Sequence, residues 1–353
     1  MTALVWLSSR RNLGWRRRRF VITVVGTTLA FALTLLLSGF RDGVDVEATR
    51  TIRALGGNAF VVKDGVSGPF TTIAQVPAGL ADELAGRPEV RGADPVVSVR
   101  HAIESAPVTD VYLVGARPGG LGMPPVARGR AATYRGETVL DTRAGRRVGD
   151  RVRLGGREFT VVGLVRKVTV WGGLPTMFVT LPDAQDLVFG GLPSATTILV
   201  AGSPRGGLPP GVRSLTRPQA LADLERPLAS FVAAIDLFRI LIWMVAAAIV
   251  GSVLYISALE RSRDFAVFKA FGTGTADLVG TLVVEAVALS AVAAGAAAVL
   301  SRLLSGLFPA VISFPARTMV LLPVVALAIG VVGSLAGARR AMAVDPALAF
   351  AGQ

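Results

Sequence analysis

Residues that could carry chemistry are scarce in this sequence. Its 353 residues include one histidine, His101, and no cysteine. Disulfides, cysteine-ligated zinc and thiol catalysis are therefore excluded, and a single histidine makes a poor metal site. No grouping of serine, histidine and aspartate stands out, and the carboxylates are scattered without a close pair. We expect His101 to be structural or on the surface, and we do not expect the chain to be an enzyme.

One carboxylate has an unusual position. Glu285 is the one charged residue of the apolar segment 278–301. A charge inside a membrane span is costly and is by default a candidate functional group. We expect Glu285 to fix helix packing, by pairing with a neighbouring span or a nearby Arg, or to serve coupling. Proton transport is the alternative role.

Four apolar segments would place such residues in a membrane. The sequence is 52% hydrophobic with a mean hydropathy of +0.58. The segments 20–40, 240–259, 278–301 and 318–338 each reach the roughly 20 residues that a transmembrane helix needs. The first is longer than the core of a signal peptide, which favours an uncleaved anchor over a cleaved leader. The sequence therefore predicts a membrane α-helical protein with four spans in a one-plus-three arrangement.

The distribution of basic residues predicts the topology. Residues 1–19 contain no acidic residue and six Arg, namely Arg10, Arg11, Arg16, Arg17, Arg18 and Arg19. Positively charged flanks stay in the cytoplasm, so the N-terminus and, after four spans, the tail 339–353 are cytoplasmic. The loop 260–277 is then cytoplasmic, and the loop 302–317 is external. The net charge of +13, from 37 Lys and Arg against 24 Asp and Glu, therefore indicates topology and contact with lipid headgroups rather than nucleic-acid binding.

The segment 41–226 predicts a large extracytoplasmic α+β domain of one or two lobes. Residues 41–56 have apolar side chains at helical spacing, which predicts either a stalk that continues the first span or a short surface helix. The charged residues of this helix are expected away from its apolar stripe: Asp42, Asp45, Glu47, Arg50 and Arg53. Strands are expected at 59–63, 96–99, 111–114, 151–154, 157–165, 177–181 and 196–200, and helices at 78–85, 183–188 and 219–224. Gly155-Gly156 predicts a hairpin turn, and a stalk and the second span follow over 227–259.

Small residues recur every four positions in three of the apolar segments. Such stripes let helix backbones approach closely in lipid and would build a bundle or a dimer seam rather than a pore. Chance recurrence in Ala-rich helices is the alternative. The stripes are Gly26, Ala30, Thr34 and Ser38; Ala286, Ser290, Ala294 and Ala298; and Gly330, Ser334 and Ala338.

The cytoplasmic loop combines charge with aromatic residues. Phe265, Phe268 and Phe271 with Gly272 share one helical face within the highly charged segment 260–272. This pattern predicts a short amphipathic helix that inserts into a partner's groove, or a membrane-surface helix without a partner.

These residues resemble a known family. The segment 260–272 resembles the coupling-helix signature of FtsX/MacB-type ABC transporter permeases, in which a charged run precedes an aromatic, a basic residue and Ala-x-Gly. Three further segments resemble the family: 148–163, 283–286 and the Arg-rich tail 338–347. The sequence around 40–45 resembles the subgroup of the heterocyst glycolipid exporter permease. The family's Gly pair in span three is replaced by Ala293-Ala294-Gly295, so packing there is expected to differ.

The resemblance implies a MacB periplasmic-core-like external domain and a partner that hydrolyses ATP. The chain lacks a Gly-Lys-Ser/Thr phosphate loop, so no cofactor is expected on it, and ATP and Mg belong to a cytoplasmic ABC ATPase subunit. The residues implied to couple to that ATPase are Arg261, Arg263, Asp264, Phe265, Phe268, Lys269 and Gly272. A second permease copy in a homodimer, membrane lipids and an external adaptor or hydrolase are the other implied partners. The implied location is the bacterial cytoplasmic membrane, which the chain crosses several times.

The implied function is that of a permease which transmits ATP-driven motion to its external domain. Export or extraction of a lipid or amphiphile is the first hypothesis, because the external segment is long. A signalling scaffold that activates a cell-wall hydrolase is the alternative. Amino-acid transport is a second alternative, although solute importers of that class have more spans and a smaller external part.

Overall fold

The computed structural model describes residues 17–204, 207–260, 275–308, 311–314, 324–325, 328 and 331–332. The chain divides into two compact units. We call residues 1–42, 233–308 and 312–353 the helical unit, and residues 43–232 with 309–311 the sheet unit.

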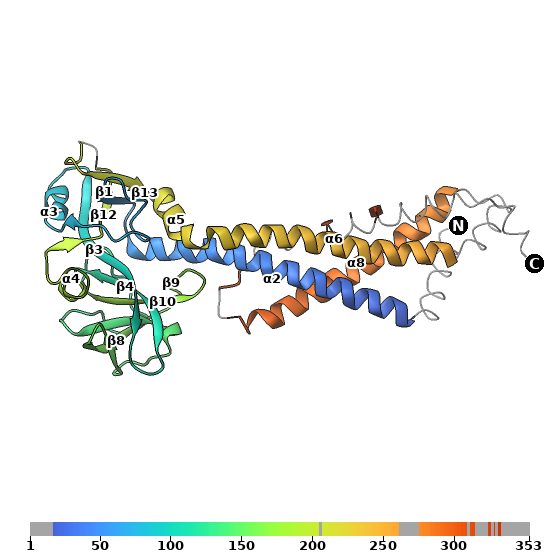
Figure 1. Ribbon diagram of the computed structural model, residues 1–353, viewed down its shortest axis with the longest axis horizontal. Helices are drawn as coiled ribbons and strands as arrows, with labels where there is room; N and C mark the ends of the chain where they lie inside the picture. The colour runs from blue at the N-terminus through green and yellow to red at the C-terminus, as the bar shows by residue number, and fades with distance from the viewer. Residues whose placement is uncertain are drawn as a thin grey trace, which may run out of the picture. The chain divides into compact units, whose positions relative to one another are not determined.

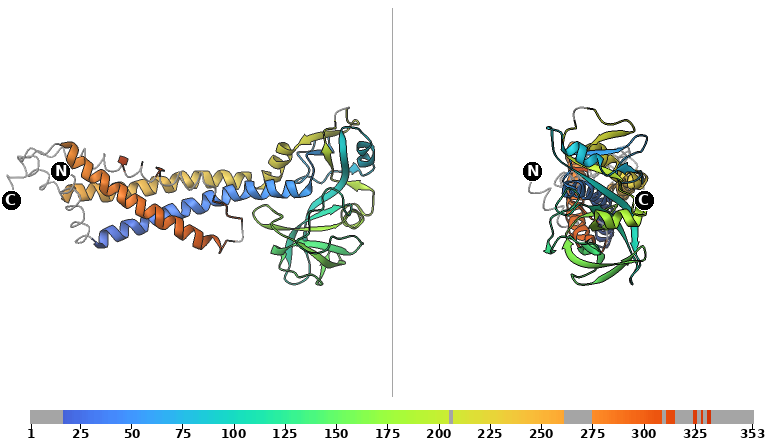
Figure 2. Two further views of the ribbon diagram at one scale, coloured as in Figure 1. Left: turned by 180° about the vertical axis from the view of Figure 1, so that it is seen from behind. Right: turned by 90° about the vertical axis from the view of Figure 1, so that its left-hand side faces the viewer.

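The helical unit contains long apolar helices. Helix α2 runs from Arg17 to Leu55, α6 from Ala229 to Glu260 and α8 from Thr275 to Ser305 (Figures 1 and 2). Among the described residues, three helical stretches are long and apolar enough to cross a membrane: Val21–Leu55, Arg217–Ser252 and Ala286–Ser305. The first three predicted spans fall within α2, α6 and α8. The fourth, 318–338, lies mostly outside the described residues, so the count of four stays a prediction.

Apolar and small side chains form the contacts between these helices. Phe31 and Leu35 of α2 are buried with Ala246 of α6 and Ala293 of α8 in one apolar cluster. Thr28 Oγ1 of α2 donates a hydrogen bond to the Ala293 carbonyl oxygen at 3.4 Å. Members of the predicted stripes are buried in the helical unit: Thr34, Ser38, Ala286, Ser290 and Ala294. The small side chains of α2 and α8 therefore pack within this chain.

The sheet unit is built on one eleven-stranded sheet. Its order is β13-β1-β12-β3-β4-β10-β6-β8-β5, with β7 on β8 and β9 on β10. The strands are β1 Ala59–Lys63, β3 Val90–Ile103, β4 Thr109–Ala116, β5 Arg128–Gly129, β6 Glu137–Asp141, β7 Arg151–Leu154, β8 Arg157–Val165, β9 Thr169–Val170, β10 Leu174–Thr180, β12 Thr197–Gly202 and β13 Val212–Thr216. A second, two-stranded sheet pairs β2 Val76–Pro77 with β11 Ser194–Ala195. The helices of this unit are α3 Leu80–Ala85, α4 Leu181–Phe189 and α5 Arg217–Glu225.

Strand β3 joins two lobes. Its first half, up to Val96, pairs with β12, and its second half, from Val97, pairs with β4. The first lobe is therefore β13-β1-β12 with the start of β3, and the second lobe is the end of β3 with β4, β10, β6 and β8. These two names denote parts of one continuous sheet within one compact unit.

Alternating side chains divide the core between the two faces of the sheet. In β4, Tyr112 and Val114 belong to one apolar cluster, whereas Val111 and Leu113 belong to another. The first of these clusters, the common face, takes residues from both lobes together with Ala48, Ile52 and Leu55 of α2 and Leu224 of α5. On the opposite face, residues of α4 pack on the second lobe and residues of α3 on the first. The alternation has the period of two that strands impose.

Most elements of the sheet unit were predicted. The strands expected at 59–63, 111–114, 151–154, 157–165, 177–181 and 196–200 and the helices at 78–85, 183–188 and 219–224 match observed elements within a few residues. The strand expected at 96–99 is only the middle of the longer β3, Val90–Ile103. The Gly155-Gly156 hairpin is confirmed, with φ of 56° and 73° at the two glycines, as a tight hairpin turn requires. Strands β6 and β13 and the two-residue strands β2, β5, β9 and β11 were missed, and the helix expected from Pro227 begins at Ala229 after a short 3-10 turn.

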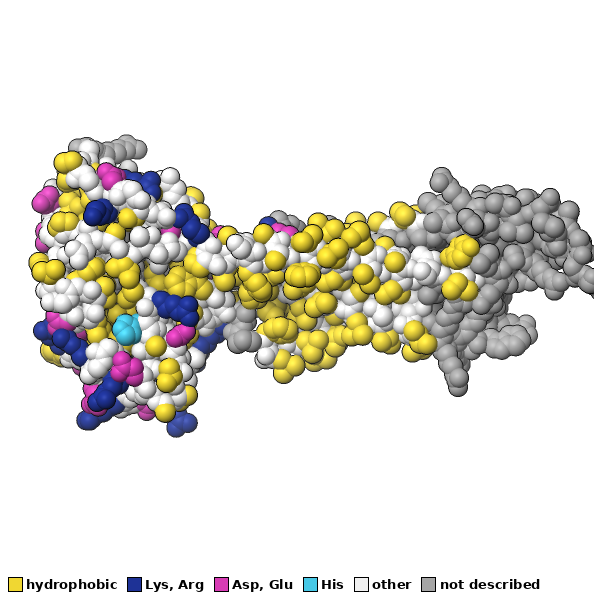
Figure 3. All heavy atoms as spheres, viewed as in Figure 1, with side chains coloured by type: hydrophobic (Ala, Val, Ile, Leu, Met, Phe, Trp, Pro, Cys, Tyr) yellow, Lys and Arg dark blue, Asp and Glu magenta, His cyan; other side chains and the backbone are white. Residues whose placement is uncertain are grey.

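The two units differ in surface chemistry. In Figure 3, charged side chains are spread over the sheet unit, whereas hydrophobic side chains cover the helices. On α6, Leu237, Phe238, Ile240 and Met244 are all more than half exposed. An apolar exposed surface of this kind on long helices is what lipid requires.

Candidate transmission site

The predicted ATPase-coupling residues lie outside the described residues. This applies to Arg261, Arg263, Asp264, Phe265, Phe268, Lys269 and Gly272. The backbone of Glu285 is within α8, but its side chain is not described. The roles of these residues therefore stay predictions.

Within the described part of the chain, no group of three or more His, Asp or Glu residues could hold a metal ion. His101 is half-buried in β3, where its Nδ1 accepts a hydrogen bond from the Ala102 amide at 2.9 Å. The role of His101 stays a prediction.

An ion pair joins α2 and α6 next to their apolar segments. Arg41 Nη1 lies 2.6 Å from both carboxylate oxygens of Asp236. Arg239 Nη1 approaches the same carboxylate at 3.1 Å. Arg41 directly follows the predicted span 20–40, and Arg239 directly precedes 240–259, so charge appears on both helices where the apolar residues end.

Glu47 is buried where α2 enters the sheet unit. The sequence placed it among the charged residues away from the apolar stripe, and this is wrong: Glu47 is 1% exposed. One carboxylate oxygen accepts a hydrogen bond from Thr169 Oγ1, and the other accepts from the Gly172 amide at 2.7 Å. One turn further along α2, Thr51 Oγ1 donates to the Thr169 carbonyl oxygen at 2.6 Å. The start of β9 and the turn after it are thus bound to α2.

Burial controls the protonation of Glu47. Removal from water raises the pKa of its carboxyl group, and the hydrogen bonds from Thr169 and Gly172 and the charge of Arg143 oppose the shift. The neutral form of this carboxyl is therefore favoured relative to an exposed glutamate.

Trp171 connects the same turn to α5. Its indole Nε1 donates a hydrogen bond to the Leu224 carbonyl oxygen at 2.7 Å. Its ring meets the Tyr112 ring edge-on, with centroids 5.1 Å apart and an interplanar angle of 77°. Tyr112 is fully enclosed in the common face, so Trp171 ties the last turn of α5 to β4.

Asp223 fastens α5 to a loop of the first lobe. Its carboxylate accepts hydrogen bonds from the Phe70 amide at 2.9 Å, from the Thr71 amide at 3.2 Å and from the Thr71 hydroxyl at 2.5 Å. A Cβ on Gly68 would lie 2.2 Å from the Asp223 side chain, so this loop needs glycine there. A buried carboxylate with three donors is fully satisfied, and it fixes the helix in place.

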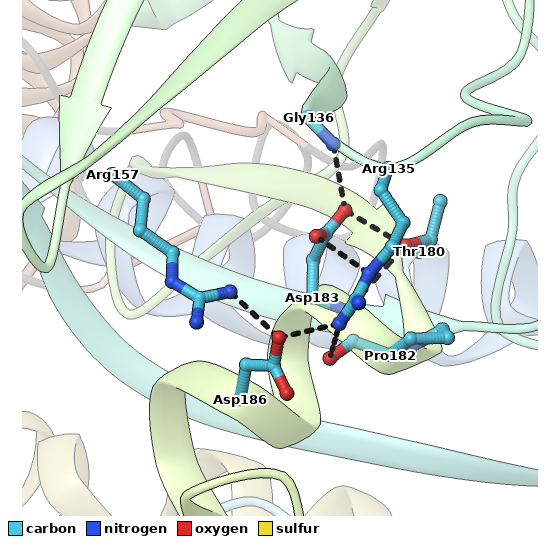
Figure 4. A network of polar contacts seen from close by, with 7 residues as sticks. All are labelled: Arg135, Gly136, Arg157, Thr180, Pro182, Asp183 and Asp186. Carbon is cyan, nitrogen blue, oxygen red and sulfur yellow. Dashed lines mark hydrogen bonds and ion pairs between the residues drawn. The ribbon is translucent and has the colours of Figure 1, made fainter.

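A third polar network stiffens the second lobe. Asp183 Oδ2 at the start of α4 accepts from the Gly136 amide at 3.0 Å and from Thr180 Oγ1 at 2.8 Å (Figure 4). Asp186, one turn later, binds Arg135 and also Arg157 at 2.7 Å. These contacts join α4 to the loop before β6 and to β8.

Sequence reasoning missed Glu47 and Trp171, and the signal for them is weak. Glu47 follows Val44 by three residues and precedes Ala48 by one, so it lies at the border of the apolar stripe rather than opposite it. Trp171 is followed by Gly172 and Gly173, a turn signal that the predicted strands left unassigned.

Two family models cover most of the chain. Residues 20–207 match the MacB-like periplasmic core domain, and residues 237–346 match the FtsX-like permease C-terminal domain. The first match alone extends over more than half of the 353 residues.

Mycobacterial relatives match over nearly the full length. A protein of Mycobacterium bovis described as an uncharacterized ABC transporter permease is 42% identical over 346 residues, which are 97% of this chain and 98% of the relative. A protein of Mycobacterium tuberculosis with the same description is 40% identical over 343 residues, with the same coverage. Neither description bears on the heterocyst glycolipid subgroup, which stays a prediction.

Solved structures of related domains are also similar. The periplasmic region of MacB from Actinobacillus actinomycetemcomitans aligns over 49% of this chain and 95% of its own, with a TM-score of 0.36 and 15% identity. The extracellular domain of the noncanonic ABC-type transporter YknZ from Gram-positive bacteria aligns over 42% and 83%, with a TM-score of 0.33 and 16% identity. These TM-scores are low, so the assignment rests on the sequence matches. By those matches, the chain belongs to the FtsX/MacB family of ABC transporter permeases.

Proposed function

We propose that this permease transmits the motion of a cytoplasmic ATPase to its sheet unit, outside the membrane. The observation that carries the proposal is the continuity of α2. The helix contains the apolar segment 20–40 and continues without a break to Leu55, whose side chain is 2% exposed in the sheet-unit core. A continuous α-helix transmits displacement along its axis because every turn is hydrogen-bonded to the next.

Helix α6 supports the same proposal, because it is the other helix through which the chain connects the two units. It extends from Ala229 to Glu260, so its chain runs from the end of α5 to the predicted coupling segment 260–277. Family membership implies a cytoplasmic ATPase partner. In the proposal, ATP and Mg bind that partner, the residues from Arg261 to Gly272 contact it, and both chain ends are cytoplasmic.

We further propose that two permease copies pair and that the substrate is a lipid or another amphiphile. The apolar exposed faces of the helices favour an amphiphile, because such a molecule can contact apolar surface and lipid together. Activation of a cell-wall hydrolase would use the same motion without a transported molecule. Amino-acid transport lacks a supporting feature in the described residues.

The test is to co-purify the permease with its ATPase. Phe268→Asp places a charge in the predicted aromatic face and is expected to abolish ATPase binding. Tyr134→Asp is the matched control, because Tyr134 is a 69% exposed aromatic of the sheet unit. Unchanged binding of the Phe268→Asp variant would refute the coupling assignment. Deleting the ATPase and comparing lipid export with hydrolase activation then separates the two leading functions.

A further inference from the structure

The two lobes of the sheet unit are attached to helices α2 and α5 in different ways. The chain leaves α2 for β1 and enters α5 from β13, and both strands belong to the first lobe. The second lobe has no direct chain connection to α2 or α5. Polar contacts of the second lobe with these helices come from the β9–β10 hairpin, residues 169–175, whose second strand lies between β4 and β6. The loop after β4 adds one more, because the Gly122 amide donates a hydrogen bond to the Leu55 carbonyl oxygen at 2.8 Å.

We infer that the β9–β10 hairpin makes the second lobe move together with α2 and α5. We call this hairpin, with its contacts to the two helices, the clasp, and Glu47 and Trp171 are its positioning residues. The inference rests on the proposed function and names the residues through which the motion would reach the second lobe. Glu47 holds the hairpin on α2 through Thr169 and Gly172, and Trp171 holds it on α5 through the Leu224 carbonyl oxygen.

Two residues in and next to this hairpin have a left-handed backbone conformation. Lys167 and Trp171 have φ of 62° and 54°, a left-handed conformation that is uncommon for residues with a Cβ. Such conformations persist where the surrounding contacts over-determine them. For Trp171 these contacts are the indole hydrogen bond to α5 and the Tyr112 ring, so the left-handed residue aims its side chain at the helix.

The hairpin also leads directly into the centre of the second lobe. Leu174 and Pro175 pair with Val170 and Thr169, and the same strand then pairs with β4 in parallel and with β6 antiparallel. Met177 and Val179 of this strand are buried among residues of the opposite face, while Phe178 is buried in the common face. A displacement of the hairpin would therefore reach both faces of the second lobe through one strand.

The first test measures the clasp without nucleotide. Amide hydrogen exchange is recorded on the full-length permease with its ATPase. Glu47→Ala leaves Thr169 and Gly172 without their partner, and exchange at residues 169–173 is expected to rise about tenfold or more, as the loss of buried hydrogen bonds implies. Glu47→Gln can accept from Gly172 and donate to Thr169, so its exchange should stay near that of the native protein. Unchanged exchange in Glu47→Ala would overturn the clasp.

Two controls test whether the change in hydrogen exchange is specific to the hairpin. Glu89→Ala removes an exposed carboxylate of the sheet unit and should leave the hairpin unaffected. Exchange in β12 and the first half of β3 reports whether each variant is folded.

Trp171→Phe is a milder second variant, because it keeps an aromatic ring beside Tyr112 while removing the indole donor. It too should accelerate exchange in the hairpin, and the absence of any change would count against the clasp.

The second test separates the clasp from the proposed function. The chain has no cysteine, so Glu83→Cys in α3 of the first lobe and Arg153→Cys in β7 of the second lobe can each carry a single spin label without background labelling. In the proposed pair of permease copies, each single label gives one distance between the copies. A nucleotide-dependent change of this distance is expected at both positions in the native background and in Glu47→Gln. In Glu47→Ala and Trp171→Phe the change should persist at Glu83→Cys and be strongly reduced at Arg153→Cys. A full change at Arg153→Cys in both of these variants would overturn the clasp and leave the proposed function standing, whereas no change at either position in the native background would refute the transmission itself.

Discussion

Arg41 Nη1 lies 2.6 Å from both oxygens of the Asp236 carboxylate, and this pair joins α2 to α6 where their apolar segments end. The two side chains are 46% and 37% exposed. Arg239 shares the carboxylate, so Asp236 balances two cations. An exposed pair of this kind fixes the register of two helices more than it stabilises them.

The Arg41–Asp236 pair is therefore expected to contribute little to stability. In a double-mutant cycle with Arg41→Gln and Asp236→Asn, the coupling free energy should be below about 1 kcal/mol. Thermal unfolding of the purified permease in lipid nanodiscs measures it. Arg302→Gln is the control, because Arg302 has no ion pair among the described residues. A coupling energy well above this range would mean that lipid shields the pair from water.

Gly115 is expected to tolerate no side chain. A Cβ at Gly115 in β4 would lie 2.0 Å from the Cβ of Ala184 in α4. Gly115→Ala should lower the free energy of unfolding by about 1–3 kcal/mol, the usual cost of overpacking. The second substitution Ala184→Gly should restore part of the loss. Gly92→Ala in β3 is the matched control, because nothing lies within 4 Å of its Cβ position. Equal effects of Gly115→Ala and Gly92→Ala would contradict the close approach of α4 to β4.

The pH dependence of stability should report the burial of Glu47. Because burial raises the pKa of Glu47, the folded protein keeps this proton at a pH where the unfolded chain, with an ordinary pKa of about 4.3, has lost it. The contribution of Glu47 to stability is thus fully present below the ordinary pKa and is lost as the pH rises through the raised value. Glu47→Gln should gain stability relative to the native protein as the pH rises from 4 towards 8. Parallel curves for the two proteins would contradict the raised pKa.

Glu137 provides the control of opposite sign. The Arg130 guanidinium beside it lowers the pKa of Glu137 to about 2. Its stabilising contribution is present above the ordinary pKa and is lost as the pH falls through about 2. Like Glu47, Asp141 and Glu225 have raised pKa values, with burial as the largest cause, so they too make stability depend on pH. The informative quantity is therefore the difference in stability between each variant and the native protein at the same pH. Glu137→Gln should therefore lose stability relative to the native protein as the pH rises from 2 to 5.

The topology predicts which residues an external reagent reaches. Arg153→Cys in β7 should react with a membrane-impermeant maleimide added to intact cells. Ser9→Cys in the Arg-rich N-terminal segment should react only after the cells are opened. The reverse pattern, or protection of residues 127–164 from protease in intact cells, would invert the proposed orientation. The absence of native cysteine makes each label unique.

Local sequence patterns were sufficient for most elements of the fold. Uninterrupted apolar residues define α2, α6 and α8, and Gly155-Gly156 defines the hairpin of β7 and β8, because each of these signals depends only on neighbouring residues. Strand β6 was missed because Glu137–Asp141 is short and its partners, β10 and β8, are distant in sequence. Strand β13 was missed because only Leu215 of its five residues is buried.

The sequence by itself determined that this protein has long apolar segments, an α+β segment between the first two of them and no cysteine. Those conclusions follow from composition and period, which need no tertiary contact. Only the tertiary structure decided that Glu47 is buried rather than solvent-facing, and that Trp171 reaches the end of α5. The reason is physical: the burial of a side chain on a helix depends on which distant segment covers it, and here that segment is a hairpin 122 residues further along the chain.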